Sequence, residues 1–155
     1  MAIVFLGLGS NLGNRNEQLL AAINLLSEKA GNNPVFSDFY ETEPWGYSSP
    51  NPYLNVAVQL KTSLSPFELL TVTQQIEREL GRTTKTKEGQ YADRHIDIDI
   101  LMYDDLILQT PELVLPHPRM HQRLFVLQPL AAIAPKLLHP VLNKTIMELL
   151  ELMLH

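Results

Sequence analysis

The sequence predicts an α+β fold in which helices cover one face of an antiparallel sheet, followed by a C-terminal helical extension. Six segments of suitable length and pattern come first, namely strands at 2–8, 35–42, 53–61 and 95–101 and helices at 14–29 and 65–81. The strands are recognised by apolar runs or alternation, and the helices by apolar residues three or four apart or by their boundary residues. The resulting order, β-α-β-β-α-β, is that of a ferredoxin-like domain.

The first strand and helix are predicted from apolar patterning. The run AIVFLGL at 2–8 has strand length, and GSNLGNR at 9–15 is expected to turn the chain out of it. The helix carries one apolar stripe, made of Leu19, Leu20, Ile23, Leu26 and Ala30. We expect GNNP at 31–34 to end this helix and VFSDFYET at 35–42 to form the second strand.

The middle of the chain has a long loop, a strand and a second helix. The prolines and glycine of EPWGYSSPNP at 43–52 exclude regular structure, and its aromatic residues favour a binding loop. The strand at 53–61 alternates, with Leu54, Val56, Val58 and Leu60 on one face and Tyr53, Asn55, Ala57 and Gln59 on the other. Three signals start the next helix, since Ser65 can cap it, Pro66 suits the first position and Glu68 completes a capping box. That helix should end at Gly81.

The strand at 95–101 separates apolar from acidic side chains. Ile96, Ile98 and Ile100 recur at every second position, so this row should face the helices. Asp97 and Asp99 then lie on the open face, although aspartate is disfavoured in strands. After a turn at Asp104 and Asp105, the segment LILQ, a proline-containing loop and helices near 119–133 and 145–154 complete one domain that spans 1–155.

Composition and charge narrow the possible functions. The chain has 155 residues and no cysteine, which excludes disulfides, thiolate catalysis and cysteine-bound zinc. The N-terminal apolar run is too short for a signal peptide or a membrane span, so we expect a cytoplasmic protein with no membrane partner. A net charge of -5 argues against a nucleic-acid partner.

Positive charge nevertheless flanks the aspartates in the sequence. Five of the 12 lysines and arginines lie between 78 and 94, and two more follow the strand, the full set being Arg78, Arg82, Lys85, Lys87, Arg94, Arg119 and Arg123. One interpretation is a solvated, salt-bridged surface. The other is that basic segments and a carboxylate pair converge on a compact anionic ligand.

The two aspartates predict a metal site. Alternate residues of a strand are about 6–7 Å apart, so two carboxylates can lean toward a shared ligand. Such oxygen ligands suit Mg²⁺, which takes one or two carboxylates and completes its coordination with water and phosphate. Two Mg²⁺ ions about 3.5–4 Å apart could clamp a phosphorus during in-line displacement. The alternative is an exposed strand face that only keeps its carboxylates in water.

Two further motifs have weaker interpretations. GLGSNLG at 7–13 begins like a dinucleotide fingerprint, but Leu12 replaces its last glycine and the expected βαβ repeat is absent. Its glycines are better explained by a tight turn. His117 and His121 are four residues apart, but Pro118 places His117 before the helix and no H-E-x-x-H glutamate accompanies them. A histidine that contacts phosphate, or a structural one, fits better than a zinc ligand.

Five motifs in order resemble one family. They are LGSNLGNR (8–15), FYETEPWG (39–46), YLNVAV (53–58), RHIDIDIL (94–101) and LPHPRMHQRLFVLQPL (115–130). Together they cover most of the chain and resemble 6-hydroxymethyl-7,8-dihydropterin pyrophosphokinase. The resemblance implies a ferredoxin-like fold and the transfer of a pyrophosphoryl group from ATP to the pterin hydroxymethyl in folate biosynthesis.

The resemblance also implies a set of site residues. The catalytic residues would be Arg82, Arg94, Asp97 and Asp99, with the aspartates binding two Mg²⁺ ions. ATP would contact Gln74, Glu77, Tyr91, Ile100, His117 and Arg123. The pterin would lie between Tyr53 and Phe125, with further contacts from Thr42, Trp45 and Asn55.

We therefore expect direct attack of the pterin hydroxyl on the β-phosphorus of ATP, with AMP leaving. Two other functions remain open, a non-catalytic ferredoxin-like module that binds a nucleotide or RNA, and a metal-dependent phosphohydrolase. An RNA-binding sheet would present aromatic residues on its open face, whereas this one presents two aspartates. We expect a monomer that acts on ATP and the pterin.

Overall fold

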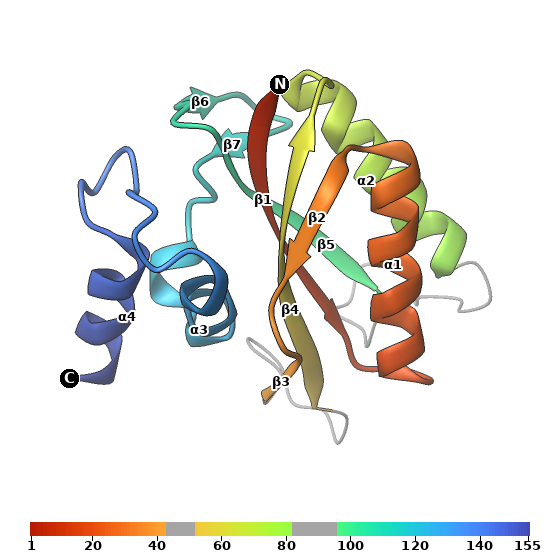
Figure 1. The fold of residues 1–155 in the computed structure, drawn as a ribbon, viewed down its shortest axis with the longest axis horizontal. Coiled ribbons are helices and arrows are strands. Elements are labelled where there is room, and N and C mark those ends of the chain that lie inside the picture. The colour runs from red at the N-terminus through yellow and green to blue at the C-terminus, as the bar shows by residue number, and fades with distance from the viewer. Residues whose placement is uncertain (43–51, 82–95) are drawn as a thin grey trace.

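The computed structural model describes residues 1–42, 52–81 and 96–155. Within these ranges, five strands form one antiparallel sheet in the order β2-β4-β1-β5, with β3 also paired to β4 (Figure 1). The elements in chain order are β1 (Ala2–Ser10), α1 (Arg15–Lys29), β2 (Asn32–Phe36), β3 (Tyr40–Thr42), β4 (Tyr53–Thr62), α2 (Pro66–Leu80), β5 (Asp97–Tyr103), β6 (Leu108–Gln109), β7 (Val114–Leu115), the 3-10 helix η1 (Met120–Gln122), α3 (Leu124–Ile133) and α4 (Ile146–Leu154). This strand order confirms the ferredoxin-like prediction.

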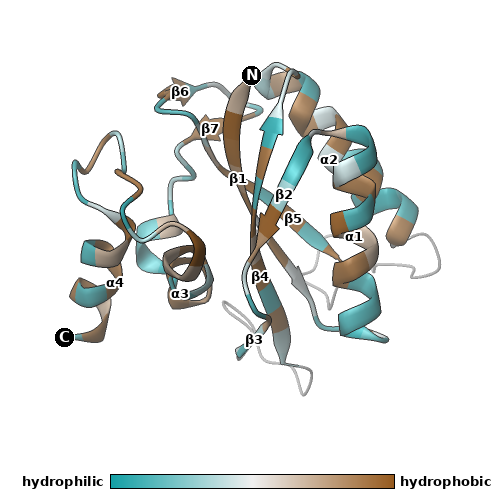
Figure 2. Cartoon of the chain, viewed as in Figure 1, coloured by the Kyte–Doolittle hydropathy of each residue, from teal (hydrophilic) through white to brown (hydrophobic). Residues whose placement is uncertain are grey.

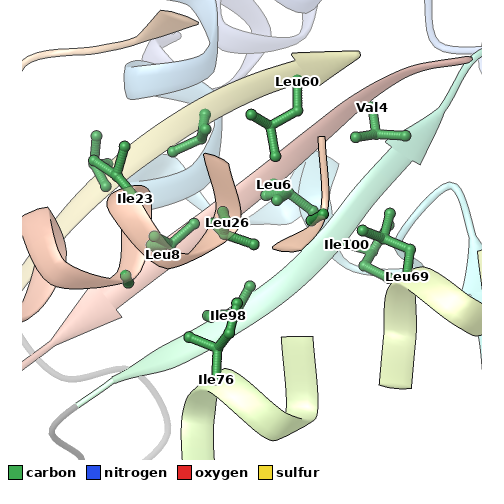
Figure 3. Close-up of a cluster of buried hydrophobic side chains, with 14 of the residues drawn as sticks. Val4, Leu6, Leu8, Ile23, Leu26, Leu60, Leu69, Ile76, Ile98 and Ile100 are labelled. Carbon is green, nitrogen blue, oxygen red and sulfur yellow. The ribbon is translucent and has the colours of Figure 1, made fainter. Parts of the chain in front are cut away.

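The main core lies between the sheet and helices α1 and α2. Figure 3 shows β1, β4 and β5 directing apolar side chains toward the two helices. Ile98 and Ile100 are 6% and 4% exposed and pack in this core with Leu69 and Ile76 of α2. The alternation of β5 therefore places its isoleucines as the sequence predicts.

Both helix starts follow their capping residues. The side chain of Asn14 accepts a hydrogen bond from the backbone N–H of Glu17 at the start of α1. At α2 the capping box of Ser65 and Glu68 is formed, with Pro66 as the first helical residue. The predicted stripe of α1 contains one error, because Leu20 is 46% exposed. Leu20 is one residue beyond Leu19 and so points about 100° away from it around the helix.

The predicted strand at 35–42 is two strands. Ser37 lies between β2 and β3, and its hydroxyl accepts the backbone N–H of Ala57 while donating to the carbonyl of Asp38. This hydroxyl takes a place that a backbone carbonyl would have in a continuous ladder. The segment at 31–34 follows the end of α1, as expected, but β2 already begins within it, at Asn32, and accommodates a positive φ of 52° at Asn33.

The C-terminal extension covers part of the other face of the sheet (Figure 1). The sequence predicted the extension but not where it packs. Phe5, Ala57 and Leu101 point to this face and form a second core with residues of η1, α3 and α4. Figure 2 shows α3 mainly in brown, as expected of a helix packed on several sides. The helix predicted near 119–133 is divided into η1 and α3 by the extended backbone of Arg123.

Candidate active site

The part of the second face that carries Asp97 is organised as a row across the sheet. In register, Gly9 of β1 lies opposite both Asp97 of β5 and Asn55 of β4, and Asn55 lies opposite Tyr40 of β3. Directly paired residues point to the same face. Asp97, Gly9, Asn55 and Tyr40 therefore form one row, which we call the site row.

The adjacent row contains the second carboxylate. Gly7 lies opposite Asp99 on one side and Ala57 on the other. Both aspartates are half-buried, and each lies beside a glycine that has no side chain. The prediction that these glycines form a tight turn was wrong, because Gly7 and Gly9 are both within β1. The two glycines therefore belong to the sheet face that carries the carboxylates.

Gly9 is also required by its neighbours on β4. A Cβ atom at Gly9 would lie 3.1 Å from Asn55 Oδ1 and 3.2 Å from Tyr53 Cδ1. A Cβ at Gly7 would come no closer than 3.4 Å to any other atom, and its nearest neighbours would be atoms of the Leu101 side chain. Gly9 therefore lets Asn55 and Tyr53 lie over β1.

The outer edge of β5 is held by α2. Glu77 Oε2 accepts the backbone N–H of Ile98 at 2.8 Å, which joins the end of α2 to the edge strand. Gln74, one turn earlier, is exposed. The side chain of Ile100 is buried in the main core, so any nucleotide contact of Ile100 would use its backbone. Alternation directs the N–H of Ile100 to the same outer edge as that of Ile98.

His117 and Arg123 approach Asp97 from the C-terminal extension. The backbone N–H of His117 donates to the carbonyl of Leu101 at 2.8 Å. The side-chain Nδ1 of His117 accepts a hydrogen bond from the backbone N–H of Arg119 at 3.2 Å. Burial and, to a smaller extent, the charge of Arg123 together lower the pKa of His117 to about 4, against the opposing effect of Asp97. The imidazole is therefore neutral near pH 7, with its proton on Nε2 because Nδ1 is an acceptor.

The zinc interpretation of the two histidines finds no support. The His121 ring packs edge-on against His139, with the ring centroids 6.3 Å apart. In the described part of the chain, no group of three or more His, Asp or Glu side chains is placed to hold a metal ion. Two carboxylates without a third protein ligand still suit Mg²⁺, which keeps several positions for water and phosphate.

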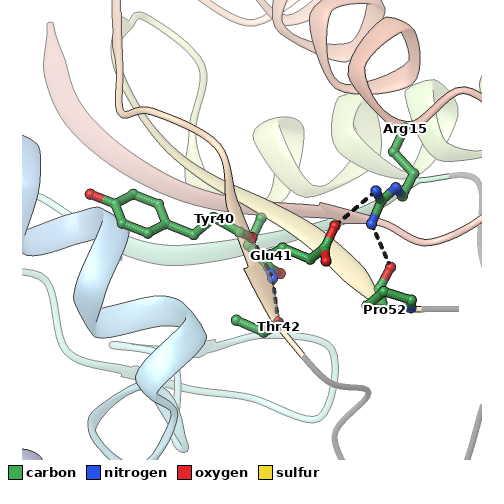
Figure 4. A network of polar contacts seen from close by, with 6 residues as sticks. Arg15, Tyr40, Glu41, Thr42 and Pro52 are labelled. Atoms are coloured by element: carbon green, nitrogen blue, oxygen red, sulfur yellow. Dashed lines mark hydrogen bonds and ion pairs between the residues drawn. The ribbon is translucent and has the colours of Figure 1, made fainter.

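The opposite end of the site row contains residues predicted to bind the pterin. Asn55 is 5% exposed, and its Nδ2 donates to Thr42 Oγ1 at 2.7 Å and to the Tyr40 carbonyl at 3.4 Å (Figure 4). Tyr53 lies opposite Thr42 in the β3–β4 ladder. Phe125 of α3 is partly buried, with the guanidinium carbon of Arg123 5.6 Å from its ring centroid. The structure thus brings Thr42, Tyr53 and Asn55 together.

Some predicted site residues lie outside the described residues, and some residues of the site were not predicted. Trp45, Arg82, Tyr91 and Arg94 lie outside the described residues. The sequence interpretation gave no site role to Gly7, Gly9, Tyr40 or Arg15. Strand alternation could have placed the two glycines on the aspartate face, since they share the parity of Phe5. Arg15 had no comparable signal, because its partners are 26 and 37 residues away in the sequence.

The fold and the site row define a class of protein, an α+β domain in which one sheet face can bring a phosphate-bearing group beside a planar heterocycle. Carboxylates with a nearby histidine and arginine lie at one end, and an amide with aromatic residues lies at the other. Aromatic faces and an amide suit a flat heterocycle.

Comparisons with known proteins specify the family. Residues 5–135 match the model of 7,8-dihydro-6-hydroxymethylpterin-pyrophosphokinase (HPPK). The chain is 55% identical over 141 residues to the 2-amino-4-hydroxy-6-hydroxymethyldihydropteridine pyrophosphokinase of Porphyromonas gingivalis, covering 90% of this chain and 95% of the relative. It is 48% identical over 132 residues to the enzyme of the same name from Bacillus subtilis, covering 84% and 77%. The chain belongs to the HPPK family.

Solved structures agree on the fold. The crystal structure of a Plasmodium falciparum HPPK-DHPS triple mutant matches with a TM-score of 0.77 at 20% identity, covering 97% of this chain. The match spans 44% of that longer chain, so this chain is less than half its length. At this identity the likeness supports the architecture alone.

Proposed function

We propose that this chain transfers a pyrophosphoryl group from ATP to 6-hydroxymethyl-7,8-dihydropterin, giving AMP and the pterin diphosphate for folate biosynthesis. The observation that carries the proposal is the site row, in which Asp97 and Asn55 lie on one sheet face with Gly9 between them. Strands are about 4.8 Å apart, so these two backbone positions are roughly 10 Å apart. Family membership is consistent with the same reaction.

The pterin is assigned to the Asn55 end of the row. Its ring stacks between Tyr53 and Phe125, and Asn55 and Thr42 supply hydrogen bonds to its edge, together with Trp45. The Asn55–Thr42 hydrogen bond supports this assignment, because it fixes the orientation of the amide before the substrate arrives. An amide so fixed offers its oxygen as an acceptor toward the ligand.

ATP is assigned to the Asp97 end. Asp97 and Asp99 would hold two Mg²⁺ ions, and the fit is supported by two half-buried carboxylates on one face of one strand, an oxygen donor set that suits Mg²⁺. When bound, Mg²⁺ supplies positive charge to the polyphosphate and to the oxygens of the transfer. The further ATP contacts proposed here are Gln74, Glu77, Tyr91, the backbone of Ile100, His117 and Arg123.

The protein groups mainly position the reactants and balance their charge. The pterin hydroxyl oxygen forms a bond to the β-phosphorus and gives up its proton to solvent, the bond from that phosphorus to the α–β bridging oxygen breaks, and AMP leaves with that oxygen. His117 contributes a neutral N–H donor rather than a second positive charge, given its lowered pKa. Arg82, Arg94 and Arg123 offset the negative charge of the transferred group.

The decisive experiment measures products from the purified chain, ATP and 6-hydroxymethyl-7,8-dihydropterin, with and without Mg²⁺. The proposal expects AMP and pterin diphosphate in equal amounts, only when both the pterin and Mg²⁺ are present. Release of phosphate or pyrophosphate without the pterin would indicate the phosphohydrolase instead. Nucleotide or RNA binding with no product would indicate the non-catalytic module.

Cellular context is part of the same proposal. We place the reaction in the cytoplasm and assign it to a monomer with no nucleic-acid or membrane partner. Each helix in the described ranges is too short or too polar to span a bilayer.

A further inference from the structure

Arg15 joins three segments that are distant in the sequence. It is the first residue of α1, and one guanidinium nitrogen donates to the Pro52 carbonyl at 3.0 Å while the other donates to Glu41 Oε2 at 2.9 Å (Figure 4). Glu41 belongs to β3, and Pro52 immediately precedes β4. The two hydrogen bonds thus connect the start of α1 to both strands that carry the pterin-side residues.

Arg15 is not explained by a contribution to stability, either through the helix that it begins or through its ion pair. A positive side chain is unfavourable in the first turn of a helix, where the helix dipole favours acidic residues. The ion pair with Glu41 is solvent-accessible, with side chains 30% and 57% exposed. Such pairs contribute little to folding. What distinguishes Arg15 is that its two hydrogen bonds reach β3 and the residue that precedes β4.

The strand that Arg15 holds is short. Strand β3 has three residues and pairs with β4 through Tyr40–Asn55, Glu41–Leu54 and Thr42–Tyr53. A ladder of this length is weak by itself. The Asn55–Thr42 hydrogen bond depends on this register, so it would be lost if β3 separated from β4.

We propose that Arg15 is a positioning residue for the pterin site. It keeps the Thr42–Tyr53 end of the β3–β4 ladder closed, and thereby holds Thr42 against Asn55 in the orientation that receives the pterin. This inference rests on the proposed function for its ligand, but the effect on the ladder does not depend on any ligand.

The test compares Arg15→Ala and Arg15→Lys with Lys29→Ala. Lys29 is a matched control, because it forms a similar exposed ion pair with Glu79, 3.2 Å long, in the last turn of the same helix. We expect Arg15→Ala to raise the KM for the pterin about five- to tenfold, with kcat and the KM for ATP within about twofold of wild type. Arg15→Lys should behave like the alanine variant, since a single ammonium cannot reproduce the two-pronged geometry. Lys29→Ala should match wild type.

Amide hydrogen exchange in the ligand-free protein provides a second readout. Exchange at Thr42 and Tyr53 should be faster in Arg15→Ala and unchanged in Lys29→Ala. Unchanged exchange in Arg15→Ala, or equal rises in KM for both substrates, would overturn the positioning role. If wild type forms no pterin diphosphate, the proposed function and the pterin assignment fail, while the exchange data still decide whether Arg15 holds the ladder.

Discussion

Replacing Gly9 with alanine should weaken pterin binding by crowding the middle of the site row. The new methyl carbon would lie 3.1 Å from Asn55 Oδ1 and 3.2 Å from Tyr53 Cδ1. Those atoms would have to move by a few tenths of an ångström to restore ordinary contact. Asn55 cannot move freely, because it is 5% exposed and its amide donates to Thr42 at 2.7 Å.

The size of the effect follows from this crowding. Extra methyl groups in well-packed positions cost about 1–3 kcal/mol. Because the crowded atoms belong to a proposed binding site, part of this cost should appear as lost affinity, about tenfold in Kd or ~1.4 kcal/mol. Gly7→Ala is the matched control, since the atoms nearest its methyl would be those of the Leu101 side chain, at an ordinary contact distance of 3.4 Å or more. A glycine-to-alanine change without strain stabilises a protein by about 0.4–1 kcal/mol.

Two measurements are needed. Fluorescence titration with 6-hydroxymethylpterin gives the affinity, and urea denaturation gives the free energy of unfolding. Gly9→Ala should bind about tenfold more weakly and unfold more easily, whereas Gly7→Ala should be at least as stable as wild type. If Gly9→Ala binds the pterin as tightly as wild type, the site row is not where the ligand lies.

Three other predictions concern the metal, pH and the core. Asp97→Asn and Asp99→Asn should each lower kcat at least about 100-fold and abolish the Mg²⁺ dependence of ATP binding, as measured by isothermal titration. His117 takes up its proton near pH 6.5 when unfolded but near 4 when folded, so the metal-free protein should lose stability as pH falls through this window, by at most about 3 kcal/mol in urea denaturation. Thr62→Val should cost about 1–3 kcal/mol of unfolding free energy, because the buried hydroxyl accepts from Leu64 and donates to the Ala30 carbonyl.

Each of these three has an outcome that would contradict it. Near-normal turnover of either asparagine variant would remove the carboxylates from the metal site. His117→Gln provides the comparison for the pH experiment, and an equal loss of stability in that variant would mean that other groups cause it. An unchanged midpoint of urea denaturation for Thr62→Val would show that solvent or a shifted backbone replaces both hydrogen bonds.

Sequence patterns predicted those parts of the fold that depend on local rules. The alternation of β5 gave both the buried isoleucines and the aspartate face, and Ser65, Pro66 and Glu68 gave the start of α2. These predictions were correct because the direction of a side chain in a strand and the capping of a helix end are set by neighbouring residues.

Other parts depend on partners that no local pattern reveals. The break between β2 and β3 arises because the Ser37 hydroxyl bonds to Ala57, twenty residues further on. The placement of α3 was not predictable, since this helix is apolar on most sides and contains Pro129, so its pattern indicates no single buried face.

The site was only partly predictable from the residues themselves. Spacing identified Asp97 and Asp99 as a pair, but the meeting of Asn55 with Thr42 was expected only from family resemblance. The roles of Gly9 and Arg15 were not predicted, because a missing side chain and a long-range hydrogen bond become apparent only when the strands are in register.

The hydrogen bond from Ile98 to Glu77 has a consequence for behaviour at high concentration. Among the described residues, strand β5 is an outer strand of the sheet, and an unpaired outer strand can recruit a strand from another molecule. Glu77 occupies a backbone donor there and adds negative charge, while at the opposite border Pro34 of β2 has no N–H to offer. Both borders therefore discourage intermolecular strand pairing, and Glu77→Ala should make the protein more prone to aggregate.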